Sequence, residues 1–181
     1  MSASVGIRPA REHDVPAIRA MLATAVRSGE VLPRAVVAAD FLVAEDTAEL
    51  VGIVALTEWS DSVVELGSLV AIRRGCGVGA RLVASAIEWA AMRGYSDIVA
   101  LTAIDDWFAR RGFVAVSIAP WALARRSPRL MSLSSSGGAI FEATVVKAQR
   151  SCATCHRLGA CRQVLMHQPL SAPGVRRQWV A

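Results

Sequence analysis

Several residue types are nearly absent from this chain of 181 residues. It has no asparagine, one tyrosine (Tyr95) and one lysine (Lys147), so arginine carries almost all of its positive charge. In many nucleic-acid-binding proteins, basic residues are clustered and interleaved with aromatic residues. The arginines of this chain are dispersed and are not interleaved in this way. Biased codon usage explains this composition as well as selection for a polyanion does. We therefore expect no nucleic-acid partner, although the net charge of +5 favours the approach of small anions.

Long hydrophobic runs are also absent, although 54% of the residues are hydrophobic. Charged residues interrupt the Ala- and Val-rich segments, and no stretch approaches the roughly 20 apolar residues of a membrane span. The N-terminus enters residues 5–9 without the basic, apolar and small-residue regions of a secretory signal. We therefore expect a cytoplasmic protein with no membrane partner. Its length suits one domain with a short appendage.

The hydrophobic pattern predicts alternating strands and helices. Helices are expected from Asp14, as an N-cap, to about Arg27, from residue 78 to Gly94, and at residues 105–111. β-Branched and apolar runs predict strands at residues 5–9, 41–45, 50–60, 63–72, 98–101, 113–116 and 139–146. Residues 120–138 are expected to form an irregular insertion.

A glycine-rich segment lies between an apolar strand and the most strongly periodic helix. We call it the glycine loop, and its residues are Arg74, Gly75, Cys76, Gly77, Val78, Gly79 and Ala80. Alternating glycines let the backbone turn tightly with its N–H groups inward, and the following helix adds the positive end of its dipole. This arrangement favours a bound anion such as pyrophosphate. A tight turn that leads into a helix would explain the same glycines.

The Arg-x-x-Gly-x-Gly spacing of this loop resembles the acetyl-CoA loop of the Gcn5-related N-acetyltransferase (GNAT) superfamily. Within it, the chain resembles the short ArgA-type N-acetylglutamate synthases over residues 7–10, 14–18, 32–34, 41–45, 51–52, 65–66, 68–69, 101–102 and 107–113. The resemblance implies an α/β (α+β) GNAT fold, with a mixed, mostly antiparallel central sheet flanked by helices. It also implies an acetyltransferase domain at residues 1–148 and a Cys-rich C-terminal tail at residues 149–181.

The same resemblance implies a function and a set of site residues. The protein would be an acetyl-CoA-dependent N-acetyltransferase acting on a free amino acid, first of all L-glutamate, as in arginine biosynthesis. Arg34, beside Leu32, would hold a substrate carboxylate by a bidentate pair, and Glu65 would take a proton from the acceptor amine. The alternative for Arg34 is a solvated arginine at the start of a helix. The alternative for Glu65 is a strand-edge carboxylate paired with an arginine. Acetyl-CoA would be bound by Leu69, Val70, the glycine loop and Phe108.

The chain departs from the family pattern in ways that keep other functions open. Phe108 stands where many GNAT enzymes have a tyrosine that protonates the leaving CoA thiolate, and the segments after Ser68 and Arg34 are shortened. The alternatives are an acetyltransferase for another small amine or for protein lysine, and a non-catalytic acyl-CoA-binding or regulatory module. A homodimer also stays open as the assembly.

Three of the four cysteines lie within ten residues near the C-terminus, with the spacing Cys152-x-x-Cys155-x5-Cys161. With His156 or His167 as a fourth ligand, this spacing is compatible with a structural zinc ion. It also resembles the tail of some short ArgA-like acetyltransferases. A reduced, metal-free tail is the alternative, since a disulfide is not expected in the cytoplasm.

Overall fold

The computed structural model describes residues 5–73, 75–116, 120, 123 and 138–171. The chain forms two compact units, which are described separately below. Of the described residues, 5–57, 66–73 and 75–93 belong to the first unit, and 58–65, 94–116, 120, 123 and 138–171 belong to the second. Strands β3 and β4 each run from one unit into the other.

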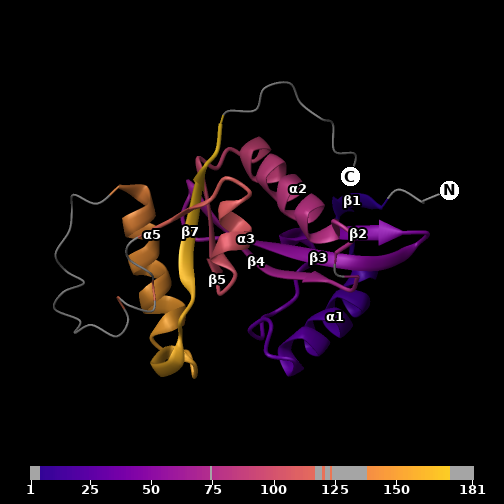
Figure 1. The fold of residues 1–181 in the computed structure, drawn as a ribbon, viewed down its shortest axis with the longest axis horizontal. Coiled ribbons are helices and arrows are strands. Elements are labelled where there is room, and N and C mark those ends of the chain that lie inside the picture. The colour runs from indigo at the N-terminus through magenta and orange to yellow at the C-terminus, as the bar shows by residue number, and fades with distance from the viewer. Residues whose placement is uncertain (1–4, 74, 117–119, 121–122, 124–137, 172–181) are drawn as a thin grey trace. The chain divides into compact units, whose positions relative to one another are not determined.

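The first unit is a sheet with a helix on each face (Figure 1). Its strands are β1 (Gly6–Pro9), β2 (Phe41–Asp46), nearly all of β3 (Glu49–Glu58) and the later part of β4 (Val63–Ala71). Its helices are η1 (Glu12–Asp14), α1 (Val15–Arg27), η2 (Ala38–Asp40) and α2 (Val78–Met92). Strands β1, β2 and β3 pair antiparallel in sequence order. The predicted helices and strands of this region are therefore confirmed.

Side-chain alternation in β2 and β3 decides which helix covers which face of this sheet. Helix α1 packs on one face through a buried cluster, and its members are Ile18, Leu22, Phe41, Val43, Ile53 and Ala55. Successive residues of a strand point to opposite faces. Gly52, next to Ile53, therefore lies on the other face, where α2 approaches it.

The second unit is built around β5 (Asp97–Thr102), β6 (Val114–Ala115) and β7 (Val164–Pro169). The start of β4 pairs parallel with β5, and β7 pairs antiparallel with both β5 and β6. Its helices are α3 (Asp105–Ala109), α5 (Ala139–Lys147), a π-helical turn (Ala148–Cys152) and η5 (Leu158–Ala160). Helix α5 packs on the strands through a cluster that includes Trp59, Val63, Val99, Ala143 and Leu165.

Two expectations for the second unit need correction. The strand predicted at residues 139–146 is wrong, because these residues form helix α5. A strand was not foreseen at residues 164–169, which form β7. Most of the predicted insertion at residues 120–138 lies outside the described residues. The division of the chain at residue 148 stays a prediction.

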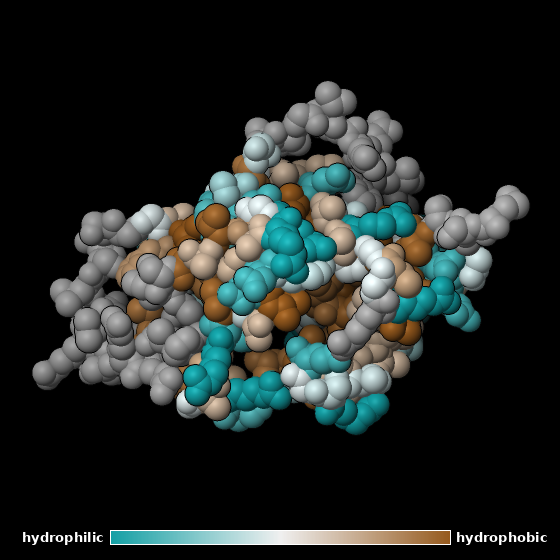
Figure 2. All heavy atoms as spheres, in the orientation of Figure 1, coloured by the Kyte–Doolittle hydropathy of each residue, from teal (hydrophilic) through white to brown (hydrophobic). Residues whose placement is uncertain are grey.

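The complete strand order is β1-β2-β3-β4-β5-β7-β6 in a seven-stranded sheet. This order, mostly antiparallel and flanked by helices, confirms the predicted fold class. In the described part of the chain, no helix has the length and apolarity needed to cross a membrane. On the face shown in Figure 2, hydrophobic and hydrophilic residues are interspersed, so a single broad apolar patch does not dominate this view.

Candidate functional site

The glycine loop leads directly into helix α2 in the first unit. Gly75 and Gly77 have φ angles of 79° and 77°, in the left-handed region that side chains disfavour. Gly77 is the N-cap residue of α2, and no side chain caps this helix end. Residues 75–77 are exposed. The first amide groups of α2 are therefore suited to bind an anion. Arg74 lies outside the described residues.

Gly52 of β3 fixes the start of α2 against the sheet. A Cβ atom at this position would lie 2.8 Å from Val78 Cγ1, 2.9 Å from Leu82 Cδ1 and 3.1 Å from the Val70 carbonyl oxygen. Only glycine permits so close an approach between helix and strand. Since Val78 belongs to the glycine loop, the packing at Gly52 also sets the position of this loop.

Strand β4 is distorted at Ser68, two residues before Val70. Ser68 has a φ angle of 49°, which is uncommon for a residue other than glycine. Non-glycine residues held in this region often lie near functional sites, because the surrounding structure must offset their strain. Leu69 and Val70, the predicted acetyl-CoA contacts, follow directly and are half-buried.

Arg34 lies in the loop after α1 and is not simply solvated. Its Nη2 atom lies 3.6 Å from Asp40 Oδ2, and its guanidinium carbon lies 5.2 Å from the centre of the Phe41 ring. Its side chain is 21% exposed, whereas the neighbouring Leu32 is 37% exposed. The long distance to Asp40 indicates a weak pair.

Glu65, at the start of β4 in the second unit, is held by two donors on one oxygen. Trp59 Nε1 donates to Glu65 Oε2 at 2.9 Å, and Lys147 Nζ donates to the same oxygen at 2.8 Å. The side chains of Glu65 and Lys147 are 14% and 20% exposed. The alternative for Glu65 was a carboxylate paired with an arginine. Glu65 is paired, but its partner is a lysine. Among the described residues, no donor contacts Oε1.

Sequence reasoning did not connect Lys147 or Trp59 with Glu65. Lys147 is 82 positions away along the chain, and the segment before it was interpreted as a strand. Its ammonium group also lies 5.5 Å from the centre of the Trp59 ring. The one feature of the sequence that marks this position is that Lys147 is the only lysine.

Phe108 is a packed residue of helix α3. Its ring makes edge contacts with Trp107 and Phe113, at centroid distances of 5.1 and 5.2 Å, and the residue is 4% exposed. The only tyrosine, Tyr95, donates a hydrogen bond to Glu58 Oε2 at 3.0 Å. Phe108 is therefore part of the core of the second unit, and it has no acidic hydroxyl group.

The tail cysteines are not arranged as a metal site. All are free thiols, and no group of three or more His, Cys, Asp or Glu residues within the described ranges could hold a metal ion. Cys152 ends the π-helical turn, where burial raises the pKa of its thiol to about 11 against the opposing effect of Lys147. His167 Nε2 lies 2.8 Å from Asp97 Oδ1. The structure therefore gives no support to the zinc ion predicted at Cys152, Cys155 and Cys161.

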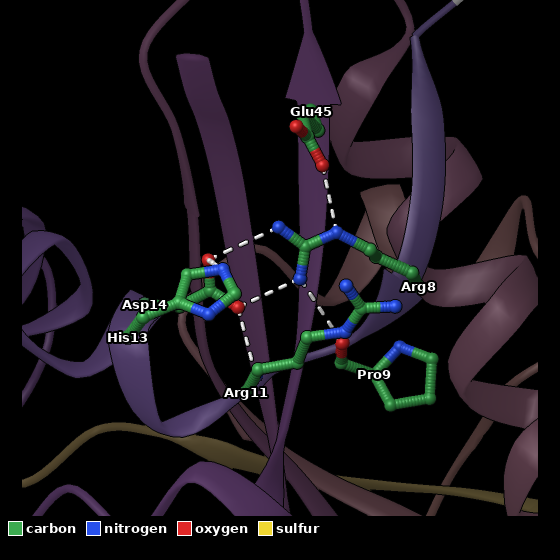
Figure 3. Close-up of polar contacts among 6 residues, drawn as sticks. All are labelled: Arg8, Pro9, Arg11, His13, Asp14 and Glu45. Carbon is green, nitrogen blue, oxygen red and sulfur yellow. Dashed lines mark hydrogen bonds and ion pairs between the residues drawn. The ribbon is translucent and has the colours of Figure 1, made fainter. Parts of the chain in front are cut away.

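A second polar cluster was also missed, and it lies in the first unit (Figure 3). Arg8 donates to Asp14 Oδ2 at 2.7 Å, to Asp14 Oδ1 at 3.0 Å and to Glu45 Oε2 at 2.7 Å. Asp14 occupies the predicted N-cap position of α1, but its side chain does not cap this helix. Instead it accepts from Arg8 and from the Arg11 amide. These bonds lower the pKa of the Asp14 carboxyl group, against the effect of burial.

The family of the chain follows from a comparison with known families. The acetyltransferase (GNAT) family matches residues 22–113, which is just over half of the sequence. The chain belongs to this family. No curated protein matches the sequence.

Solved structures share the fold of this GNAT protein. N-acetylglutamate synthase from Neisseria gonorrhoeae, complexed with coenzyme A and N-acetyl-glutamate, superposes with a TM-score of 0.67 at 24% identity. The match covers 94% of this chain and 36% of the synthase, so the chain spans about a third of that protein. Rv2747 from Mycobacterium tuberculosis, in complex with CoA, has a TM-score of 0.67 at 20% identity, with 92% of this chain and 99% of Rv2747 covered.

The family match separates two groups of site residues. Arg34, Glu65, the glycine loop and Phe108 all lie within residues 22–113. Lys147, which holds Glu65, lies beyond the matched region, as do the tail cysteines. The partner of Glu65 is thus a feature of this chain that the family match does not supply.

Proposed function

We propose that this GNAT protein transfers the acetyl group of acetyl-CoA to the amine of a free amino acid, with L-glutamate as the first candidate. The observation that carries the proposal is Glu65, a largely buried carboxylate with one oxygen held by two donors. An amine must be unprotonated to attack a thioester, so the reaction at neutral pH needs a base of this kind. The complex of the Neisseria synthase with CoA and N-acetyl-glutamate supports the choice of glutamate.

In this mechanism the glycine loop binds the pyrophosphate of acetyl-CoA. The backbone amides at residues 75–80 and the N-terminus of α2 provide donors and a positive dipole for the phosphates. Backbone groups at Leu69 and Val70 are proposed to face the thioester carbonyl, where negative charge develops during the reaction. The predicted contact of Phe108 with the coenzyme is left out of this proposal, because the residue is 4% exposed and its ring packs against Trp107 and Phe113.

The acetyl transfer is proposed to proceed in two proton-coupled steps. Glu65 Oε1 accepts a proton from the acceptor ammonium, and the resulting amine attacks the thioester carbonyl carbon. The carbon–sulfur bond then breaks, CoA leaves as a thiolate, and the second proton lost by the nitrogen passes to this thiolate through water. A thiolate with a pKa of about 8.5, as for free cysteine, is an adequate leaving group without acid catalysis. Phe108 in place of tyrosine is thus compatible with turnover.

Arg34 is proposed to select an acceptor with a carboxylate group. Its weak pair with Asp40 leaves the guanidinium group able to form a bidentate pair with a substrate carboxylate. Such a pair is planar and shorter than the 3.6 Å contact, so it would be the stronger one.

The proposal is tested by measuring release of CoA thiol from acetyl-CoA with a panel of amino acids that includes glutamate. We expect turnover with glutamate and a loss of about a hundredfold or more in kcat for Glu65→Gln, as is usual when a general base is removed. Gly77→Asp should abolish CoA binding, because its carboxylate would repel the phosphates. Turnover of glutamate that is unchanged in Glu65→Gln would refute the assignment of the base.

A second function is favoured by the buried, hydroxyl-free ring of Phe108. The protein would then be an acyl-CoA-binding module without catalysis. Calorimetric titration separates the two functions, because the module would bind acetyl-CoA at the glycine loop but release no thiol with any acceptor.

A further inference from the structure

Lys147 places an amine next to Glu65, where the proposed mechanism also places the acceptor amine. Its Nζ atom lies 2.8 Å from Glu65 Oε2, within hydrogen-bond distance of the group that would remove its proton. We infer that Lys147 is itself an acetyl acceptor, so that the protein acetylates its own single lysine. This inference rests on the proposed function, since it requires acetyl-CoA as the donor and Glu65 as the base.

The choice of lysine at this position supports a chemical role. The chain contains 20 Lys and Arg residues, and only the residue paired with Glu65 is a lysine. The ion pairs with Asp14 and Glu45, by contrast, use the guanidinium group of Arg8 (Figure 3). Guanidinium keeps its proton in proteins, whereas a lysine ammonium can lose one and become a nucleophile. The ion pair with Glu65 therefore uses the one basic side chain that can be acylated.

The position of Lys147 also suits acyl transfer. It is the last residue of α5, and its ammonium group is carried by a flexible four-carbon stem. The ammonium lies beside Trp59 as well as Glu65, and the side chain is only 20% exposed. A largely buried amine loses less energy to desolvation when it attacks, because most of its hydration shell is already absent.

The proposed step balances in atoms and protons. Glu65 takes one proton from the Lys147 ammonium, and the nitrogen lone pair forms a bond to the thioester carbonyl carbon. The carbon–sulfur bond breaks, and the second proton lost by the nitrogen goes to the CoA thiolate. The products are acetylated Lys147, CoA thiol and the proton on Glu65, which passes to water.

Acetylation would change the surroundings of Glu65. An acetylated lysine has no positive charge and cannot form an ion pair. The carboxylate would then retain only the Trp59 donor. Acetylation of Lys147 would thus leave the Glu65 carboxylate without a cationic partner.

The experiment incubates the purified full-length protein with acetyl-CoA and no acceptor, and follows intact mass and peptide masses. We expect one acetyl group per chain, located on Lys147, with a rate that does not depend on protein concentration. Lys147→Arg should incorporate no acetyl group, while it keeps a cation beside Glu65. Glu65→Gln should lower the rate at Lys147 by about a hundredfold.

Glu65→Gln also distinguishes enzymatic from spontaneous acetylation. Spontaneous acetylation needs no protein base, so its rate would not fall when the carboxylate is lost in this variant. An unchanged or faster rate at Lys147 would overturn the inference, as would a rate that rises with protein concentration. Acetyl groups found only on the N-terminus or on cysteines would overturn it as well.

A parallel thiol-release assay with free amino acids keeps the two proposals apart. Turnover of a free acceptor without acetylation of Lys147 would overturn this inference and leave the proposed function intact. Absence of both reactions would overturn the proposed function, and the inference with it.

Discussion

The close packing at Gly52 can be tested by a single added methyl group. In Gly52→Ala the new Cβ would lie 2.8 and 2.9 Å from side-chain atoms of Val78 and Leu82, and 3.1 Å from the Val70 carbonyl oxygen. The two side chains can rotate, but the carbonyl oxygen belongs to strand β4 and cannot move alone. Overpacking of this kind costs about 1–3 kcal/mol. The loss of glycine flexibility in the unfolded chain offsets about 0.4–1 kcal/mol of this cost.

We therefore expect Gly52→Ala to lower the free energy of unfolding by about 1–2 kcal/mol, and Tm by about 3–6 °C. The affinity for CoA should fall as well, because the start of α2 carries the glycine loop. Gly6→Ala in β1 is the matched control, since a Cβ there would come no closer than 4.0 Å to its nearest neighbour, the Glu45 carbonyl oxygen. The packing argument would be refuted if Gly52→Ala melted at or above the temperature of Gly6→Ala.

Further predictions concern the polar clusters. Asp14→Asn should lower the free energy of unfolding by about 2–3 kcal/mol in urea denaturation. The partly exposed guanidinium group of Arg8 would lose the negative charge of Asp14 that it pairs with. Because Arg8 lowers the pKa of Asp14 below 3.8, the carboxylate stabilises the fold at neutral pH, and this advantage over Asp14→Asn should disappear as the pH falls below about 4. Arg34→Ala should raise the KM for glutamate about tenfold, with little change in the KM for acetyl-CoA, in steady-state assays. Cys152, whose pKa is about 11, should react with iodoacetamide at pH 8 far more slowly than exposed Cys76, as peptide mass analysis would show.

The elements that sequence predicted well are those with a strong local pattern. Helices α1 and α2 have apolar residues at helical spacing, and the glycines at 75 and 77 mark a turn that only glycine favours. Residues 139–146 were predicted wrongly because their β-branched residues favour a strand. Their propensity is weak compared with the packing of Ala143 and Ile140 against Trp59 and Leu165.

The candidate site was predictable only where family resemblance or a short motif marks it. Glu65 and Arg34 were identified as candidates, but their partners were not. The pair between Glu65 and Lys147 joins residues 82 positions apart, and Asp14 was assigned to a helix end that its side chain does not cap. The pair between Glu65 and Lys147 depends on how helix α5 packs on the strands, which local periodicity does not encode.

The insertion of β7 between β5 and β6 has a consequence for the order in which the chain can fold during synthesis. Residues 97–102 and 114–115 are made early, but the strand that joins them comes from residues 164–169. Until those late residues leave the ribosome, one edge of β5 has no partner in the native pairing, and open strand edges favour association with other chains. A chain that stops before residue 164 would keep this edge open permanently. The native edge of β5 is therefore closed only after residues 164–169 have been made, well after β5 and β6 themselves.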